Sequence, residues 1–282
     1  MQSIPAPAEL SAKCDWFTRT FSDPKIREFV YDDYQIAADI LQLDGHEPSS
    51  WQWMGYEGMS IAGLTWGHRE DGDIVRCTGG LAERMFSRFC NYQGNTSRLD
   101  VAVTMSWTKP QRHLATDAYA YICSQRPEES RRTYSLVVNS KGGETLYVGA
   151  RASDQFGRLY DKSAEQGRSP IGREWRYEVE FKKERAVRAL ELLQNQRDRR
   201  KMYLGLVASY FVARGVTLPP IEEHTPYKIE LADPPRSVET QLAWLRRQVQ
   251  PVVGKLQRAG LEEAVIEALR LERTSSDGST KH

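Results

Sequence analysis

Two segments, GRLYDK at residues 157–162 and WRYEVE at residues 175–180, decide how this chain folds. The first places a tyrosine among cations after an apolar, strand-like run, and the second alternates charged and apolar residues with the period of two that is typical of a β-strand. In the second segment this period places Arg176, Glu178 and Glu180 on one face. In the first, it places Arg158 and Lys162 on the same face as Tyr160. We therefore expect two strands whose charged faces carry the chemistry of the protein.

Outward from these segments, strands and helices follow one another without a strict βαβ order. Glycine-containing turns, such as Asp71-Gly72, join neighbouring strands. Alternating or apolar runs predict strands at residues 14–21, 59–66, 74–78, 98–104, 134–138 and 145–150, and helical spacing predicts helices at 25–43, 81–90 and 116–124. The sequence thus predicts an α+β fold, a mostly antiparallel sheet with helices packed on it.

After Phe181 the pattern becomes almost wholly helical, with helices expected at residues 183–196 and 202–212 and two more nearer the C-terminus. We therefore divide the chain into four parts. These are a flexible leader (1–12), a sheet-containing domain (13–184), a helical C-terminal region (185–273) and a disordered tail (274–282).

Composition excludes several classes of protein. The chain has 282 residues, of which 40% are hydrophobic and 27% charged, as in globular proteins. It has no apolar run long enough to span a membrane and no secretory signal at its start, so we expect a cytoplasmic protein without a membrane partner. It also lacks the glycine-rich phosphate-binding loop of nucleotide hydrolases.

The net charge of +1 indicates no particular partner, but the charge is unevenly distributed. Basic residues outnumber acidic ones between Lys182 and Lys201, on a predicted helix. Such a surface suits contacts with DNA phosphates, and the alternative is an ordinary solvated helix. The candidate DNA-binding residues are Lys182, Lys183, Arg185 and Arg188.

An ordered set of motifs resembles a known family. The motifs are Asp15-Trp16, Arg98-Leu99-Asp100, the segment at 145–153, Arg158-Leu159-Tyr160-Asp161-Lys162 and Arg176-Tyr177-Glu178-Val179-Glu180. In order and spacing they resemble the Rep_trans family of plasmid and phage rolling-circle replication initiators, which also includes relaxases of integrative conjugative elements. The resemblance runs from about residue 15 to about residue 184 and implies a nucleotidyltransferase or relaxase-like fold.

The resemblance implies a site-specific nickase that cuts and rejoins one strand of origin DNA. In such enzymes a tyrosine attacks a backbone phosphorus, leaving a 5′-phosphotyrosyl link and a free 3′-hydroxyl. The matching tyrosine is Tyr160, with Arg158, Lys162 and Arg176 as the cations that assist it. The alternative for Tyr160 is a packed strand tyrosine, and Tyr147 and Tyr177 are its rivals.

A metal ion, Mg²⁺ or Mn²⁺, is the expected cofactor, with Asp100 and Glu178 as its ligands. Both are acids within strands, where an apolar residue would be cheaper to bury. The alternative is that Asp100 pairs with Arg98 and Glu178 with Arg176. No two histidines are separated by one residue, so the His-hydrophobe-His metal motif is absent, and His113 is a minor candidate ligand.

Other functions and partners stay open. The same chemistry serves a relaxase for conjugative transfer, and a non-catalytic DNA-binding initiator or repressor of a mobile element would need neither Tyr160 nor the carboxylates. Expected partners are origin DNA, as duplex and as hairpin or single strand, with a host helicase and a second copy of the chain as further possibilities. Trp51, Trp53 and Tyr56 could stack on unpaired bases, with core packing as the alternative.

Overall fold

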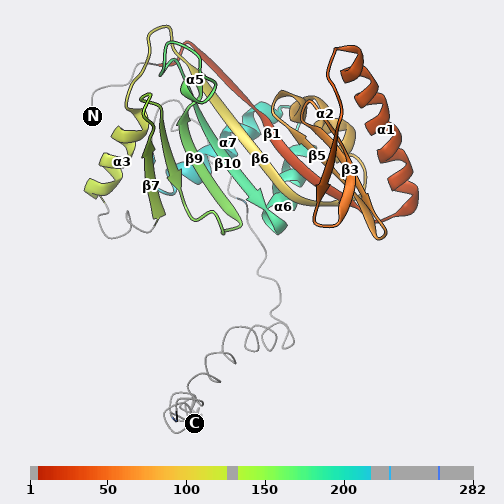
Figure 1. Ribbon diagram of the computed structural model, residues 1–282. Coiled ribbons are helices and arrows are strands. Elements are labelled where there is room, and N and C mark those ends of the chain that lie inside the picture. Colours follow the sequence, from red (N-terminus) through yellow and green to blue (C-terminus); the bar gives the residue numbers. More distant parts are fainter. Residues whose placement is uncertain (1–5, 126–132, 217–228, 230–259, 261–282) are drawn as a thin grey trace, which may run out of the picture. The chain divides into compact units, whose positions relative to one another are not determined.

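The structure of the chain is a computed structural model that describes residues 6–125 and 133–216 together with residues 229 and 260. Figure 1 shows its helices and strands. In chain order they are β1 (Glu9–Phe21), α1 (Pro24–Leu43), β2 (Ser49–Trp53), β3 (Tyr56–Ile61), β4 (Leu64–Arg69), β5 (Gly72–Thr78), α2 (Gly80–Cys90), β6 (Asn95–Ser106), α3 (Leu114–Gln125), β7 (Tyr134–Val138), β8 (Glu144–Val148), β9 (Gln155–Asp161), α5 (Lys162–Glu165), β10 (Glu174–Lys182), α6 (Lys183–Gln194) and α7 (Arg199–Val212).

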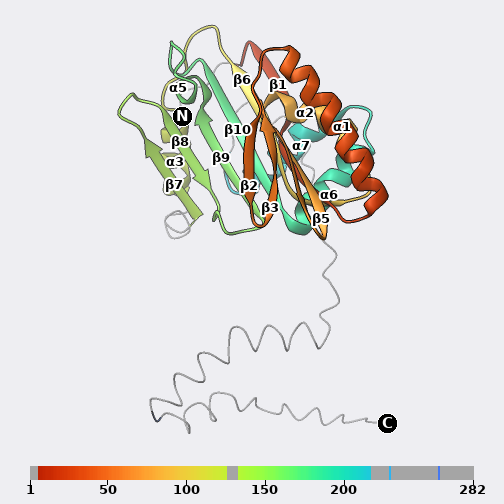
Figure 2. The ribbon, with the colours of Figure 1, turned by 45° about the vertical axis from the view of Figure 1, so that its right-hand side comes forward.

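The strands form one ten-stranded sheet in the order β2-β3-β4-β5-β1-β6-β10-β9-β8-β7. Every pairing among the described residues is antiparallel. The long strands β1 and β6 lie at the centre, and the two runs of sequential strands form the two ends, orange and green in Figure 2. The predicted α+β fold with a mostly antiparallel sheet is therefore confirmed.

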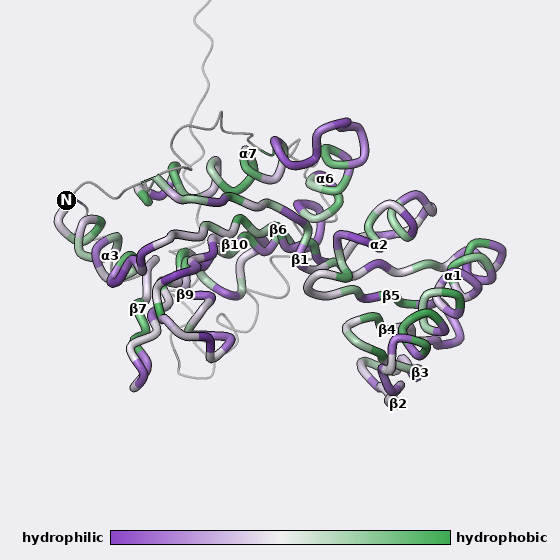
Figure 3. Tube along the Cα trace, turned by 90° about the horizontal axis from the view of Figure 1, so that it is seen from above, coloured by the Kyte–Doolittle hydropathy of each residue, from purple (hydrophilic) through white to green (hydrophobic). Residues whose placement is uncertain are grey.

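The helices α2, α6 and α7 cover one face of the central strands, as Figure 3 shows from above. Apolar residues of β6 and β10 form the core against these helices, and the ring of Tyr177 meets that of Phe211 at 4.9 Å between centroids. The strands at both ends of the sheet bend toward the opposite side. Because side chains alternate along a strand, Asp100, Arg158, Tyr160, Arg176, Glu178 and Glu180 face that other side, here called the open face.

Local sequence signals explain the start of α1 and the junction of β10 with α6. Pro24 occupies the first turn of α1, and the Asp23 carboxylate caps that turn by accepting from the backbone N–H groups of Lys25 and Ile26. β10 ends at Lys182 and α6 begins at Lys183, so the change from strands to helices falls where the sequence predicts.

Two predicted strands differ from the structure. The strand predicted at 59–66 is wrong, because Ala62 and Gly63 take positive φ angles of 46° and 91° and turn the chain between β3 and β4. The strand predicted at 14–21 begins at Glu9, inside the predicted leader, because residues 9–13 continue the pairing with β6.

The chain divides into two compact units, Met1–Leu231 and Ala232–His282. Helices α6 and α7 belong to the first unit and pack against its sheet. The two helices predicted nearer the C-terminus and the predicted tail lie outside the described residues. A functional division at residue 184 stays a prediction. No helix of the described part has the length and apolar content needed to cross a membrane.

Candidate active site

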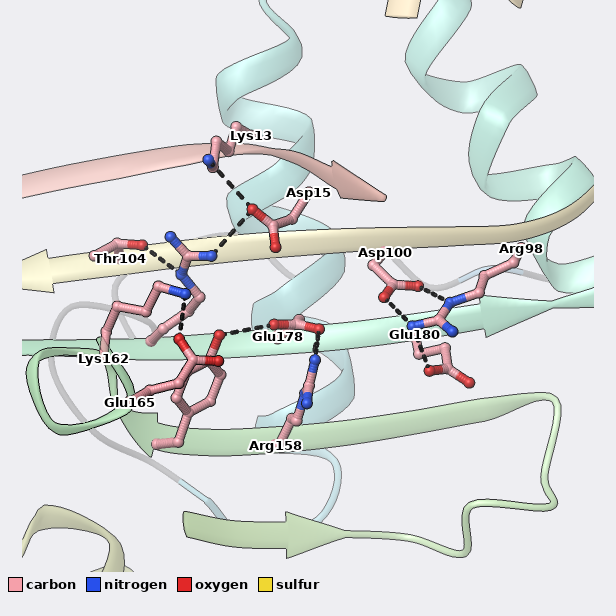
Figure 4. Close-up of polar contacts among 12 residues, drawn as sticks. Lys13, Asp15, Arg98, Asp100, Thr104, Arg158, Lys162, Glu165, Glu178 and Glu180 are labelled. Atoms are coloured by element: carbon pink, nitrogen blue, oxygen red, sulfur yellow. Dashed lines mark hydrogen bonds and ion pairs between the residues drawn. The ribbon is translucent and has the colours of Figure 1, made fainter. Parts of the chain in front are cut away.

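The open face of β1, β6, β10 and β9 gathers the charged residues that the sequence singles out (Figure 4). Their positions follow from the antiparallel register: Arg176 lies opposite Tyr160, Glu178 opposite Arg158, and Glu180 opposite Asp100. The predicted shared face of Arg176, Glu178 and Glu180 on β10 is therefore confirmed. The residues opposite them lie on β9 and β6.

Tyr160 is buried, and its hydroxyl donates a hydrogen bond of 3.0 Å to Oε2 of Glu178. The other carboxylate oxygen, Oε1, accepts from the Arg158 guanidinium, with Nε at 3.2 Å and Nη2 closer still. Glu178 itself is buried. A phenol, a carboxylate and a guanidinium thus form a connected row across β9 and β10.

The electrostatics of this row keep the phenol protonated. Burial and the Glu178 carboxylate raise the pKa of Tyr160 above its ordinary value, and the charges of Arg176 and Arg158 oppose this only in part. The Lys162 ammonium and the Arg158 guanidinium lie 5.6 and 5.4 Å from the centre of the Tyr160 ring. Tyr160 therefore needs a base to accept its proton before it can act as a nucleophile, and Glu178 Oε2 is already in place.

Access to Tyr160 is through a pocket of about 220 Å³ on the open face. Its lining includes Tyr147, Arg158, Tyr160 and Glu165. Lys162, at the start of α5, forms an ion pair with Glu165 beside this pocket. The phenol is thus buried but borders a space that a substrate group can enter.

Arg176 is held by two partners on other strands. Its Nη1 donates to Asp15 Oδ1 at 3.0 Å, and its Nε donates to Thr104 Oγ1 at 2.9 Å. Asp15 lies at a register shift in β1, between Cys14 and Trp16, where the strand bulges against β6. Bulges commonly re-aim a side chain next to a functional site, and here the bulge brings the Asp15 carboxylate to Arg176.

Asp15 stays ionised because of its cations. Burial disfavours the charged form, yet Arg176 and Lys13 outweigh it and lower the pKa of Asp15 below its usual value. Asp15 and Thr104 are not among the predicted site residues. Asp15-Trp16 belongs to the set of motifs found in the sequence, and this is the signal that could have identified Asp15. The spacing of the motifs does not show that β1 lies beside β6.

Asp100 forms a second polar group beside the first. Both of its carboxylate oxygens accept from Arg98, Oδ1 at 2.9 Å and Oδ2 at 2.6 Å. Arg98 also pairs with Glu180 at 2.9 Å. Burial raises the pKa of Asp100 to about 7 against the opposing effect of Arg98, and the nearby Glu178 and Glu180 charges add to the rise.

The arrangement does not fit a bound Mg²⁺ or Mn²⁺ as it stands. Asp100 and Glu178 supply the hard oxygen donors that such ions prefer. However, both oxygens of Asp100 accept from Arg98, and those of Glu178 accept from Arg158 and Tyr160. Among the described residues no group of three or more acidic, histidine or cysteine side chains is positioned to hold a metal ion. The ion-pair alternative is confirmed for Asp100, whereas Glu178 pairs with Arg158 and not with Arg176.

The predicted DNA-binding residues separate between the two faces of the sheet. Lys182, on β10, pairs with Glu180 at 2.7 Å on the open face. Lys183, Arg185 and Arg188 lie on α6, which packs against the other face. Lys183 pairs with Asp154 and Arg188 with Glu191, both at 2.8 Å. Their role in DNA binding stays a prediction.

The rival residues fall in different places. Tyr177 is fully buried against Phe211 on the helix-covered face. Tyr147 lines the same pocket as Tyr160, but its ring stacks on Phe156 at 5.9 Å. His113 pairs with Glu144 at 2.7 Å, not with Asp100 or Glu178.

Comparison with known proteins shows a family match and a similarity in fold. Residues 94–269 match the sequence model of the replication initiation factor family, Rep_trans. In fold, the chain is similar to the solved structure of a rolling circle replication initiator protein from Geobacillus stearothermophilus, with a TM-score of 0.50 and 19% sequence identity. That similarity covers 78% of this chain and 94% of the other. No curated protein matches the sequence.

Proposed function

Because this chain belongs to the replication initiation factor family, Rep_trans, we propose that it starts rolling-circle replication by nicking one strand of origin DNA with Tyr160. The observation that carries this proposal is the hydrogen bond from the buried Tyr160 hydroxyl to Glu178. A tyrosine that served only packing would not need a buried carboxylate partner, which is costly to desolvate.

In the proposed reaction the Tyr160 oxygen attacks the phosphorus of the scissile phosphodiester. Its proton passes to Glu178 Oε2, at 3.0 Å. The bond between phosphorus and the 3′-oxygen breaks, the 3′-oxygen takes up the proton that Glu178 accepted, and the 5′-phosphate stays attached to Tyr160. Attack by a 3′-hydroxyl on this phosphotyrosyl link reverses the step and rejoins the strand, so no energy source is required.

The cations around Tyr160 have separate roles in this proposal. Arg176, opposite Tyr160 in the register and fixed by Asp15 and Thr104, stabilises negative charge that develops on the attacking phenol and the phosphoryl oxygens. The Lys162 ammonium lies 5.6 Å from the centre of the same ring and can contact the entering phosphate. Arg158 holds Glu178 in place and is a positioning residue.

A divalent cation belongs to the proposal through the resemblance and through the oxygen donors present. Its chemistry when bound is to polarise a non-bridging phosphate oxygen. The resemblance implies Asp100 and Glu178 as its ligands, but their oxygens already accept from Arg98, Arg158 and Tyr160, so the nicking steps proposed above use only the protein's own residues.

The test is incubation of the purified protein with Mg²⁺ or Mn²⁺ and a supercoiled plasmid that carries the cognate origin. We expect nicked plasmid and a covalent protein–DNA adduct, both abolished in Tyr160→Phe. Tyr147→Phe is the matched control because Tyr147 borders the same pocket without contacting Glu178. Nicking that persists in Tyr160→Phe would overturn the assignment, and binding without cleavage in any variant would favour the non-catalytic initiator or repressor.

Transfer of a conjugative element would use the same residues. A plasmid that carries a transfer origin in place of a replication origin distinguishes the relaxase from the replication initiator.

A further inference from the structure

A row of alternating aromatic rings and guanidinium groups crosses the open face away from Tyr160. It runs from β2 through β5 and β1 to β6. The Arg76 guanidinium carbon lies 5.0 Å from the ring centre of Trp51 and 5.4 Å from that of Trp16. Trp53 extends the row beyond Trp51 at 6.3 Å, and Arg98 stacks over Trp16 at 4.2 Å. Through Arg98 the row reaches Asp100 and hence the candidate site.

The sheet is built to hold this row. Trp51 lies over β4 at Gly67, where a Cβ atom would come within 2.6 Å of the indole ring. A side chain at residue 67 would displace Trp51 from the sheet, so the absence of a Cβ atom at Gly67 allows the ring to pack there. Tyr56, by contrast, is buried and stacks with Arg69. For Tyr56 the structure therefore agrees with core packing and not with stacking on unpaired bases.

Arg76 is unusual among the cations of the open face. Arg98, Arg158, Arg176 and Lys182 each pair with a carboxylate. Within the described part of the chain, no carboxylate lies within ion-pair distance of Arg76. Its one hydrogen bond there, 3.3 Å to Thr65 Oγ1, is long, and its buried Nε has no acceptor. Its charge is therefore available to an anion from outside.

The row is also accessible. Trp53 is 49% exposed, and Trp51, Arg76 and Trp16 are half-buried. Tryptophans that served only the core would be covered, as Trp175 is on the other face. A line of partly exposed rings with one unpaired guanidinium combines stacking surfaces with a phosphate contact, the two elements of single-strand recognition.

We propose that Trp53, Trp51, Arg76 and Trp16 form a binding track for unpaired DNA that leads to the nick site. The rings stack on bases, and Arg76 contacts the backbone phosphate between them. Stacking of this kind requires bases that are not already stacked in a duplex, so the ligand is single-stranded. The inference rests on the proposed function only for the identity of the strand, which is the one that Tyr160 cuts.

The test measures binding of the full chain to a fluorescein-labelled oligothymidylate, with no origin sequence and no metal ion, by anisotropy and by quenching of tryptophan fluorescence. Loss of one base–ring stack corresponds to about a tenfold or greater loss of affinity. We expect this loss in Trp53→Ala, which should fold normally because Trp53 is half exposed, and in Arg76→Ala. Trp53→Phe should keep most of the affinity. Arg76→Ala should also lower the slope of log affinity against log salt by about 0.7.

Phe29→Ala is the matched control. Phe29 is 60% exposed on α1, which packs on the other face of β4 through Trp66. Unchanged affinity in folded Trp53→Ala and Arg76→Ala would overturn the track, as would equal dependence on these residues for a duplex of the same length. Tyr160→Phe should bind the oligothymidylate normally, so failure of the nicking reaction and failure of the track are separate results.

Discussion

At the scale of single residues, the account depends on Glu178. Its two oxygens accept from different partners, Tyr160 and Arg158, and it is buried. In the proposed reaction this geometry makes Glu178 the proton acceptor for Tyr160, whereas the sequence predicts a metal ligand. A metal ion cannot bind at Oε2 while the Tyr160 hydroxyl donates its hydrogen bond to that oxygen.

Glu178→Gln should therefore slow adduct formation strongly while keeping the shape of the site. A positioned general base typically contributes about 10²–10⁴-fold, and the amide cannot accept the phenolic proton. Single-turnover formation of the covalent adduct measures the effect. Glu165→Gln, at the exposed partner of Lys162, is the control and should change the rate little. Equal rates in the two variants would remove Glu178 from the mechanism.

The raised pKa of Tyr160 has a consequence for stability at alkaline pH. In the unfolded chain the phenol ionises near pH 10, whereas in the folded chain it stays protonated to a higher pH. The unfolded state thus loses its proton first, so the contribution of Tyr160 is complete below about pH 10 and is lost as the pH rises further. Denaturant unfolding across this range should show a steeper fall for the wild type than for Tyr160→Phe. Parallel curves would mean that neither burial nor the Glu178 carboxylate raises the pKa of the phenol.

At the scale of elements, the strands that carry the site are the easiest part to predict. The alternation in β10 fixes which side chains share a face, because the period of a strand is two. The bulge at Asp15 is beyond prediction from the sequence, since it depends on how β1 pairs with both β5 and β6. The turn at Ala62 is missed for a related reason: a left-handed alanine is set by its surroundings and not by its own preference.

The contact between β9 and α7 supplies a test at this scale. A Cβ atom at Gly157 would lie 2.4 Å from the Tyr210 ring, which is buried and hydrogen-bonded through its hydroxyl to Val148. Gly157→Ala should therefore destabilise the protein by about 1–3 kcal/mol, the usual cost of overpacking. Thermal or denaturant unfolding measures this. Gly80→Ala, where nothing lies within 4 Å, is the control and should be neutral or slightly stabilising. A neutral Gly157→Ala would mean that α7 does not pack as described.

At the scale of the whole molecule, the two faces of one sheet carry different groups of residues. The helix-covered face holds the core, and the open face holds nearly all the charged groups discussed here. Tyr160 and Asp100 are far apart in sequence but lie on strands that both neighbour β10. The sequence supplies the residue types and the resemblance, but only the strand order shows that Arg98 and Arg158 stand between the carboxylates and any metal ion.

The division of the chain predicts what a shorter protein can do. A chain ending at Leu231 keeps the whole ten-stranded sheet and the helices α6 and α7. It should unfold in one cooperative transition and still bind an oligothymidylate through the Trp53–Arg76 row. Calorimetry and anisotropy measure the two properties. Aggregation or loss of the transition would show that residues 232–282 complete the fold.

The central claim is that Tyr160 becomes covalently joined to DNA. The most direct measurement is peptide mass spectrometry of the protein after reaction with a single-stranded oligonucleotide that contains the cognate nick site. We predict a 5′-phosphoryl nucleotide on the peptide that contains Tyr160, with fragment ions that place it on that residue, and no adduct in Tyr160→Phe. A nucleotide on Tyr147, or cleaved DNA without any protein adduct, would contradict the account.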